Sequence, residues 1–185
     1  GMVLTNDPSL DRRCRLFRSH GISTDQRERV TLGTHYYEMV ELGYNYRITD
    51  IQCALGQSQL KKLGGWLDKR RKIAKRYDEA FAGLAGVESL RVSEDVEHAY
   101  HLYVIQVRGD RNVAYAKLRD SGIGVNVHYI PVHLHPYYRE HFGTGVGLCP
   151  VAERAYEKIL SLPIFPGLTD GEQEQVIRAV SSLEF

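Results

Sequence analysis

Four histidines within one short segment form the densest group of potentially chemical side chains in the sequence. They are His128, His133, His135 and His141, in HYIPVHLHPYYREH. Imidazole is a common zinc ligand, and two histidines one residue apart can face the same way on a strand. Two prolines interrupt the segment, however, and no carboxylate stands at a typical ligand spacing. A histidine-based metal-binding protein is therefore kept as an alternative. The main expectation is that no residue ligates a metal and that this polar loop lines a cleft or an interface.

A second candidate is the segment GYNYRITD (43–50). Its Asn45 and Arg47 can both contact an anion, and they stand directly before a helix that begins near Thr49. A helix N-terminus behind an asparagine and an arginine suits a phosphate. The alternative is a capped helix, in which Asn45 satisfies turn backbone and Arg47 pairs with a carboxylate. Both interpretations remain open from these residues alone.

No nucleophile is marked by a motif, because the sequence contains neither GxSxG nor a P-loop. A lysine that forms a Schiff base needs a lowered pKa in an enclosed site. All the lysines instead fall in amphipathic helical stretches, where we expect solvated side chains. They are Lys61, Lys62, Lys69, Lys72, Lys75, Lys117 and Lys158.

Composition excludes several classes of protein. The 185 residues are 43% hydrophobic and 25% charged, with a net charge of +1, which indicates a globular protein. This balance argues against a nucleic-acid partner, and no apolar run is long enough to span a membrane. The three cysteines form no CxxC pair, and no secretory signal is visible. We therefore expect reduced thiols and a cytoplasmic location.

The elements that must position these residues begin with a predicted buried strand over Gly1–Thr5 (GMVLT). A chain that starts inside such a strand looks cut. A helix follows, with Asn6 or Asp7 as N-cap and Pro8 in its first turn, and it ends at Gly21. Residues 22–44 show no clear period and are predicted to be a long loop.

From Thr49 the apolar residues keep a helical register over one long helix, and Gln52 completes a capping box. The pair Gly64 and Gly65 is expected to weaken or bend this helix. Its basic run over 69–76 is interpreted as a solvated face. The register consists of Ile51, Leu55, Leu60, Leu63, Leu67, Ile73, Tyr77 and Phe81.

The second half alternates between strands and helices, which predicts a small α/β lobe. The expected elements are a strand over Tyr100–Val107, a helix over Arg111–Asp120, a strand over Gly124–Ile130, a helix over Pro150–Leu160, an extended segment over Ser161–Pro166 and a helix over Thr169–Leu183, with Thr169 and Glu172 as a capping box.

Five blocks of the sequence, given below in chain order, resemble one protein family. The sequence is similar to the C-terminal half of the DegT/DnrJ/EryC1/StrS nucleotide-sugar aminotransferases, and most of all to the branch that aminates a UDP-linked 4-keto sugar in pseudaminic acid biosynthesis. The resemblance covers essentially the whole chain. The blocks are LFRSHGI (16–22), YYEMVELGYNYRITDIQCALGQSQLKKL (36–63), HLYVI (101–105), GIGVNVHYIPVHLHPYY (122–138) and SLPIFPGLT (161–169).

The resemblance implies an α/β fold, the C-terminal part of a type I pyridoxal-phosphate transferase. It divides the chain into a remnant of the large cofactor-binding domain (1–48), a long bridging helix (49–84) and a small C-terminal α/β domain (85–185). It also implies a homodimer with shared active sites, pyridoxal phosphate as cofactor, and transfer of an amino group from glutamate to a nucleotide-linked keto sugar. The cofactor would serve as electron sink, held by the protein.

Site residues follow from the same resemblance. Asn45 matches the asparagine that reaches the cofactor phosphate of the neighbouring subunit, and Arg47 is a candidate for the same phosphate or for the sugar. Two pairs match positions on the sugar-nucleotide side. They are Tyr36 with Tyr37 and His128 with Tyr129.

The Schiff-base lysine of the family lies upstream of the residue that matches Gly1, and no lysine of this sequence matches it. We therefore expect no catalytic residue in this chain and no catalysis by it alone. The alternative is a non-catalytic truncated paralogue that serves as an oligomerisation or interaction module.

Overall fold

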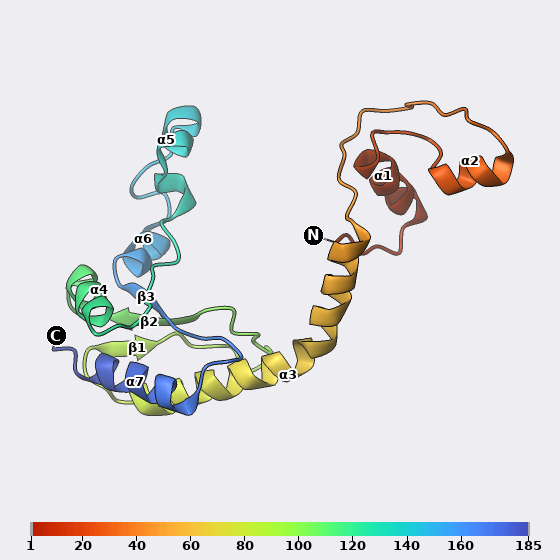
Figure 1. Cartoon of the computed structure of the whole chain (residues 1–185). Helices are drawn as coiled ribbons and strands as arrows, with labels where there is room; N and C mark the ends of the chain where they lie inside the picture. The colour runs from red at the N-terminus through yellow and green to blue at the C-terminus, as the bar shows by residue number, and fades with distance from the viewer. Residues whose placement is uncertain (1, 185) are drawn as a thin grey trace. The chain divides into compact units, whose positions relative to one another are not determined.

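The computed structural model describes residues 2–184 and divides the chain into two units, residues 1–61 and residues 62–185. Lys61 and Lys62, where the units meet in the sequence, both lie inside the helix α3 (Asp50–Phe81), so that each unit contains part of this helix. Figure 1 shows the course of the elements along the chain. Each unit is described by itself below.

Unit 2 is built on a three-stranded antiparallel sheet. Its strands are β1 (Val87–Ser89), β2 (Tyr103–Val107) and β3 (Ile159–Leu162), in the order β1-β2-β3. Ile105, at the centre of β2, pairs with Ser89 on one side and Leu160 on the other. Alternate residues of β2 are buried, whereas all four residues of β3 are buried. The sheet therefore has both of its faces covered at β3.

Three helices cover this sheet. The C-terminal half of α3 and α7 (Asp170–Ser181) lie side by side on one side of it, and α4 (Arg111–Asp120) lies on the other (Figure 1). The buried amide of Gln173 on α7 donates to the carbonyl oxygen of Ile73 on α3 at 2.8 Å. This hydrogen bond satisfies two buried polar groups where the two helices meet.

Tyr77 is the centre of the core of unit 2. Its side chain is fully buried, stacks on Phe81 with ring centroids 5.7 Å apart, and lies 4.9 Å from the ring of Tyr103. Its hydroxyl group donates to the carbonyl oxygen of Pro163 at 2.9 Å. Burial raises the pKa of Tyr77, so that the ring stays neutral. Aromatic side chains of this size supply about 1.5–3 kcal/mol each when fully buried.

An arginine of α3 organises the irregular backbone around this core. One terminal nitrogen of Arg70 donates to the carbonyl oxygens of Tyr100 at 2.8 Å, His101 at 3.4 Å and Ile164 at 3.1 Å. These carbonyls precede β2 and follow β3. A charged donor compensates carbonyl groups that no strand or helix partner reaches.

Unit 1 contains α1 (Pro8–Arg18), α2 (Gln26–Leu32) and the first turns of α3, and it has almost no core of its own. Gly21 is the single buried residue among the described residues 2–61. Neither α1 nor α2 buries a side chain, although α1 has an apolar face. What holds this unit together is therefore mainly backbone hydrogen bonding.

Several predicted elements agree with the structure. The helix predicted after Pro8 is α1, with Asp7 as its N-cap, and the helix predicted over Arg111–Asp120 has these bounds. The capping box at Thr169 is confirmed, and it begins α7. Thr49 and Gln52 also exchange the hydrogen bonds of a capping box, at 3.0 and 3.3 Å. The helix α3 continues through Gly64 and Gly65 without interruption.

The strand predicted over Gly1–Thr5 is wrong for the part that the structure describes. Met2 to Thr5 are in no strand, and Met2 and Leu4 are 84% and 86% exposed. Gly1 lies outside the described residues. An apolar run becomes a buried strand only where neighbouring strands pair with it, and no other described segment does so.

The strand predicted over Gly124–Ile130 is also wrong, because only Asn126 forms a bridge, to Ser161. The side-chain oxygen of Asn126 accepts a hydrogen bond from the amide of Val127 at 2.8 Å. A local hydrogen bond of this kind competes with the backbone hydrogen bonds of a strand pair. The helix predicted over Pro150–Leu160 ends at Tyr156, because Ile159 and Leu160 begin β3. This strand includes the first two residues of the extended segment predicted over Ser161–Pro166.

Four elements were not predicted: α2, β1, a 3-10 helix and one helix of the histidine-rich segment. The loop expected over 22–44 contains α2, and β1 precedes the strand that was predicted over Tyr100–Val107. The histidine-rich segment contains a 3-10 helix η1 (Val132–Leu134) and α5 (Pro136–Phe142), which precede α6 (Pro150–Tyr156). Pro136 stands in the first turn of α5, where a proline costs no hydrogen bond.

Candidate functional site

The loop that carries Asn45 is fixed to the C-terminal end of α1. Four backbone hydrogen bonds join the two: His20 N–H to Tyr44 O at 2.9 Å, Tyr44 N–H to Phe17 O at 2.6 Å, Tyr46 N–H to Arg18 O at 2.9 Å, and Val40 N–H to Gly21 O at 2.8 Å. The segments SHG and GYNY of the sequence therefore form one local structure.

Two glycines permit this close approach. Gly21 has φ +68°, and a Cβ atom there would lie 1.7 Å from the carbonyl oxygen of Glu41. A Cβ atom on Gly43 would lie 2.3 Å from the amide nitrogen of Gly21. Only glycine can stand at either position without moving backbone atoms. The aromatic rings of Phe17, Tyr44 and Tyr46 then gather beside the junction, with Tyr44 and Tyr46 stacked at 4.8 Å.

Asn45 and Arg47 project from this loop as an exposed pair. The Nε–H of Arg47 donates to Oδ1 of Asn45 at 3.0 Å, and both residues are exposed. The side-chain amide of Asn45 is oriented by this bond, so that its two N–H donors face away from Arg47. The pairing of Arg47 with a carboxylate, which the sequence left open, is not present among the described residues.

The helix behind the pair is already capped. Oγ1 of Thr49 accepts a hydrogen bond from the amide of Gln52, and the carbonyl oxygen of Thr49 accepts one from the amide of Cys53 at 2.9 Å. The pair Asn45 and Arg47, rather than the helix end alone, thus carries the free donors available to an anion.

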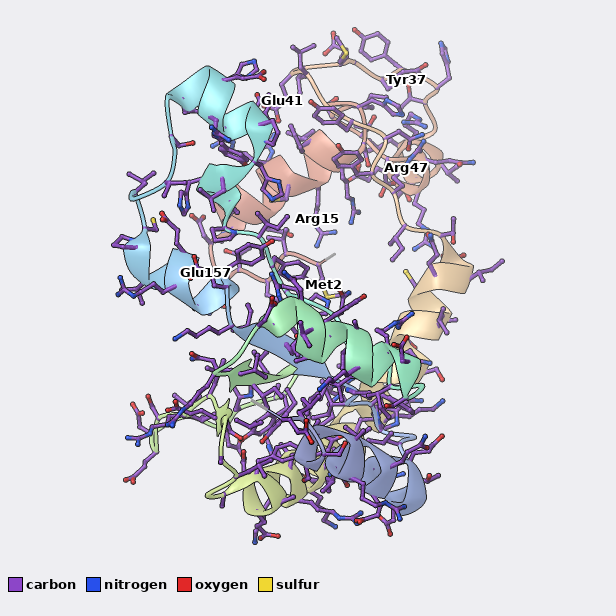
Figure 2. The ribbon with its side chains drawn as sticks, turned by 90° about the vertical axis from the view of Figure 1, so that its left-hand side faces the viewer. Met2, Arg15, Tyr37, Glu41, Arg47 and Glu157 are labelled. Carbon is purple, nitrogen blue, oxygen red and sulfur yellow. The ribbon has the colours of Figure 1, made fainter. Side chains whose placement is uncertain are left out.

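Tyr36 and Tyr37 have separate partners within unit 1. The hydroxyl of Tyr36 donates to Glu38, and this bond raises the pKa of Tyr36. The ring of Tyr37 lies 5.0 Å below the guanidinium of Arg29 on α2, a cation–π distance. Both rings remain more than half exposed. Figure 2 shows Tyr37, Glu41 and Arg47 around this loop, with Arg15 on α1.

His128 and Tyr129 belong to unit 2 and follow the bridge between Asn126 and β3. His128 is half-buried, and its Nδ1 lies 2.9 Å from Oγ of Ser161. Tyr129 is 67% exposed and its ring stands edge-on to that of His128, with centroids 4.6 Å apart. The rings of His128 and Tyr129 are thus in contact, whereas Tyr36 and Tyr37 have different partners, and the two pairs are described in different units.

Sequence reasoning missed the partner of His133. Nε2 of this buried histidine lies 2.8 Å from Glu153 of α6. The same carboxylate accepts hydrogen bonds from the amides of Gly147 at 2.9 Å and Cys149 at 3.1 Å. The hydrogen bond from the Gly147 amide is the main cause that lowers the pKa of Glu153, and the hydrogen bond with His133 is the next. Thr144 also donates to the carbonyl oxygen of His133 at 2.8 Å, so that the segment over 143–149 is tied to this pair. No spacing rule in the sequence links positions 133 and 153.

The histidines do not converge on a metal. His128 and His133 have the partners given above, and His141 bonds to the backbone of Tyr137 at 2.9 Å. Within residues 2–184, no three or more His, Cys, Asp or Glu side chains gather in a way that could hold a metal ion. The alternative of a histidine metal site therefore finds no support in the described geometry.

Pyridoxal phosphate is the cofactor that the resemblance implies, and the residues present fit it only in part. The exposed amide and guanidinium of Asn45 and Arg47 suit a phosphate. All seven lysines are exposed, and none lies in the enclosed site that lowers a lysine pKa. The donors of Asn45 and Arg47 are thus compatible with a phosphate, whereas the exposed lysines do not have the enclosed surroundings that a Schiff base needs.

One groove of unit 1 lies elsewhere, between α1 and α2. It is open, has a volume of about 840 Å³ and is lined by Arg15, Arg18, Arg27 and Asp25, among others. Arg15 is already paired with Asp11 at 2.9 Å. None of the predicted site residues lines this groove. Among residues 2–184, moreover, no helix is both long and apolar enough to cross a bilayer.

Comparison with known proteins agrees with the pattern of these elements. The sequence profile of the DegT/DnrJ/EryC1/StrS aminotransferase family matches residues 1–181. The chain belongs to this family. The resemblance on which the site residues were predicted is thereby confirmed.

Three relatives illustrate the match. The spore coat polysaccharide biosynthesis protein SpsC of Bacillus subtilis is 38% identical, over 99% of this chain and 49% of its own length. PseC of Helicobacter pylori, an aminotransferase involved in the biosynthesis of pseudoaminic acid, has a TM-score of 0.84 at 29% identity, over 95% of this chain and 46% of PseC. The sugar aminotransferase CalS13 of Micromonospora echinospora has a TM-score of 0.80 at 29% identity, over 95% of this chain and 45% of CalS13.

These matches confirm the predicted fold class, a part of the α/β fold of pyridoxal-phosphate aminotransferases. The chain spans about half the length of the family members that it matches.

Proposed function

We propose that this chain is the part of a nucleotide-sugar aminotransferase that supplies a phosphate-binding loop and a sugar-binding lobe. In the proposed reaction, an amino group passes from glutamate to a nucleotide-linked keto sugar with the help of pyridoxal phosphate. The observation that carries the proposal is the loop of Asn45 and Arg47. The chain belongs to a family of aminotransferases, backbone hydrogen bonds hold this loop against the end of α1, and side-chain N–H groups of the loop are exposed to solvent.

The proposed division of labour follows the three predicted segments. Residues 1–48 carry the loop and belong with a cofactor-binding domain, residues 49–84 are a bridging helix, and residues 85–185 form the small domain. Asn45 binds the phosphate of the cofactor held by a neighbouring subunit in a homodimer, with Arg47 beside it. Tyr36, Tyr37, His128 and Tyr129 contact the sugar nucleotide. This arrangement is supported by the exposure of Tyr36, Tyr37, Tyr129 and the loop.

The sugar proposed is a UDP-linked 4-keto sugar of the pseudaminic acid type. The likeness to PseC supports this choice, since that protein acts in the biosynthesis of pseudoaminic acid. When bound, the cofactor would supply the electron sink for the transfer. The residues of this chain would bind its phosphate and orient the sugar.

A chimera tests this proposal. This chain replaces the matching part of PseC, and amination of a UDP-linked 4-keto sugar is followed by mass spectrometry with glutamate as donor. We expect turnover, and a loss of about ten- to a hundredfold in kcat/KM on Asn45→Ala, the effect of one lost hydrogen bond to a charged group. Asn112→Ala, on the exposed start of α4, is the control and should retain activity. A folded chimera that binds cofactor and does not aminate the sugar contradicts the proposal.

A second candidate function, an interaction module, is favoured by the surface of unit 1. Its described residues include apolar side chains that are more than half exposed and that are numerous for such a small unit. We propose that another polypeptide, a second copy or a longer family member, covers them. Light scattering of the purified chain distinguishes the cases, because a clean monomer with an ordered N-terminal part argues against this function. The side chains include Met2, Val3, Leu4, Val30, Leu32, Met39, Leu42, Ile51 and Leu55.

A further inference from the structure

Ser161 is an unusual residue for its position. It stands in β3, whose four residues ILSL are all buried, and it is only 4% exposed. A hydroxyl group buried among aliphatic side chains is unfavourable unless it has a hydrogen-bond partner. Its partner is His128, whose Nδ1 lies 2.9 Å from Oγ. The serine is therefore explained by the histidine and not by the packing of the core.

Asn126 holds the other side of the same imidazole. Its backbone exchanges two hydrogen bonds with Ser161, at 3.2 and 2.8 Å, which fixes the two segments side by side. Its side-chain Oδ1 accepts a hydrogen bond from the backbone amide of Val127 at 2.8 Å. This hydrogen bond distinguishes the oxygen from the nitrogen in the side-chain amide of Asn126. Nδ2, which can only donate, then faces Nε2 of His128 at 3.4 Å.

These contacts select one form of the ring. Nε2 must be unprotonated to face a donor, so the ring proton of the neutral imidazole resides on Nδ1 and is donated to Ser161. We propose that Asn126 and Ser161 are positioning residues that hold His128 as the Nδ1–H tautomer, which leaves Nε2 as an acceptor for a hydroxyl group of the sugar. This inference rests on the proposed function.

The tautomer decides which part of a sugar nucleotide His128 can bind. A neutral ring with an unprotonated Nε2 accepts from a hydroxyl group, whereas a phosphate oxygen would need a donor or a cation in that place. The contact from Asn126 is long at 3.4 Å, so a sugar hydroxyl at an ordinary hydrogen-bond distance replaces it at little cost. Tyr129 is exposed beside the imidazole ring of His128 and can contact the same sugar ring whose hydroxyl group His128 would bind.

The experiment is ¹⁵N–¹H NMR of the imidazole rings in the 185-residue chain, near neutral pH and without substrate. Long-range couplings distinguish the two tautomers, and His128→Gln assigns the signal by removing it. We expect His128 to be the Nδ1–H form. The Nε2–H form in the unmodified chain overturns the inference, and this result requires no variant of Ser161.

Two variants test the cause. Ser161→Ala removes the acceptor of the Nδ1 proton, and we expect the His128 signal to shift toward the Nε2–H form. Ser161→Thr keeps the hydroxyl group and should restore the original tautomer, which a merely structural role would not do. Ser182→Ala, an exposed serine beyond α7, is the matched control and should change nothing. An unchanged tautomer in folded Ser161→Ala contradicts the role of this serine.

The two proposals can fail separately. An inactive chimera with the Nδ1–H form contradicts the proposed function and leaves the positioning of His128 supported. An active chimera with the Nε2–H form overturns only the positioning.

Discussion

Gly21 and Gly43 approach each other so closely that a Cβ atom on Gly43 would lie 2.3 Å from the amide nitrogen of Gly21. This contact joins the C-terminal end of α1 to the loop of Asn45 and Arg47. Unit 1 has little apolar core among its described residues, so the position of the loop depends on this backbone contact. The geometry of the candidate phosphate donors therefore depends on two residues that have no side chain.

Alanine at either glycine should release the loop. We expect Gly21→Ala and Gly43→Ala to increase amide exchange at Val40 and Tyr44 by at least about tenfold, because the hydrogen bonds of these amides cross the junction. NMR-detected hydrogen exchange measures this change. Gly33→Ala is the control, since Gly33 also has a positive φ but no atom within 4 Å of a Cβ there. It should cost about 1 kcal/mol locally and leave those two amides protected. Unchanged exchange in Gly43→Ala would show that the contact does not fix the loop.

The glycine pair of α3 should respond in the opposite way. A Cβ atom on Gly64 or Gly65 would meet nothing within 4 Å, so alanine adds helix propensity with no clash. We expect each substitution to stabilise the helix by about 1 kcal/mol. Circular dichroism during thermal unfolding measures this gain, and Ala54→Gly, on an exposed position of α3, should reverse it. A loss of stability in Gly64→Ala would mean that the helix needs its flexibility there.

The carboxylate of Glu153 should make unit 2 sensitive to acid. Hydrogen bonds from Gly147 and from His133 lower its pKa below the usual 4.5. A lowered folded-state pKa means that the stabilisation is complete above about pH 4.5 and is lost as the pH falls through the lowered pKa.

We expect Glu153→Gln to lower Tm near neutral pH and to flatten the fall of Tm below pH 4.5. Thermal unfolding over a pH series tests this expectation, with Glu157→Gln as the control on an exposed neighbour. A variant with the same acid dependence as the unmodified chain would rule out Glu153 as its source.

The lysines should show no preferred site for the cofactor. After incubation with pyridoxal phosphate and reduction with borohydride, peptide mapping should find labels spread over several exposed lysines, because none is enclosed. Pyridoxamine phosphate, which lacks the aldehyde, is the control and should give no label. Near-complete labelling of one lysine is the result that would refute this expectation.

Local signals in the sequence predicted the elements whose boundaries depend on local chemistry. The pairs Thr49 with Gln52 and Thr169 with Glu172 predicted both capping boxes. Asp25 and Glu28 form the same arrangement at the start of α2, yet this helix was expected to be a loop because its apolar period is short. The strand expected at Met2 to Thr5 failed for a different reason, since strand formation depends on partners elsewhere in the chain.

The candidate site was predictable only where a family motif or a local spacing marked it. The proposed site residues Asn45, Arg47, Tyr36 with Tyr37, and His128 with Tyr129 were predicted in this way. Glu153 and Ser161 were not, because each meets its histidine across 20 and 33 positions of sequence. The meaning of a buried polar residue such as Ser161 becomes visible only when its partner is known.

The side chain of Arg70 has a consequence for evolution. One guanidinium nitrogen serves three carbonyl groups that precede β2 and follow β3, and the neighbouring Arg71 contacts the backbone of His98 and the carboxylate of Glu97. The path of the irregular chain before β2 therefore depends on α3 as well as on local contacts, such as the hydrogen bond from the amide of Tyr100 to the side chain of His98. We expect homologues with the same backbone path to keep an arginine at position 70, because lysine, with its single ammonium group and different geometry, is not an equivalent replacement.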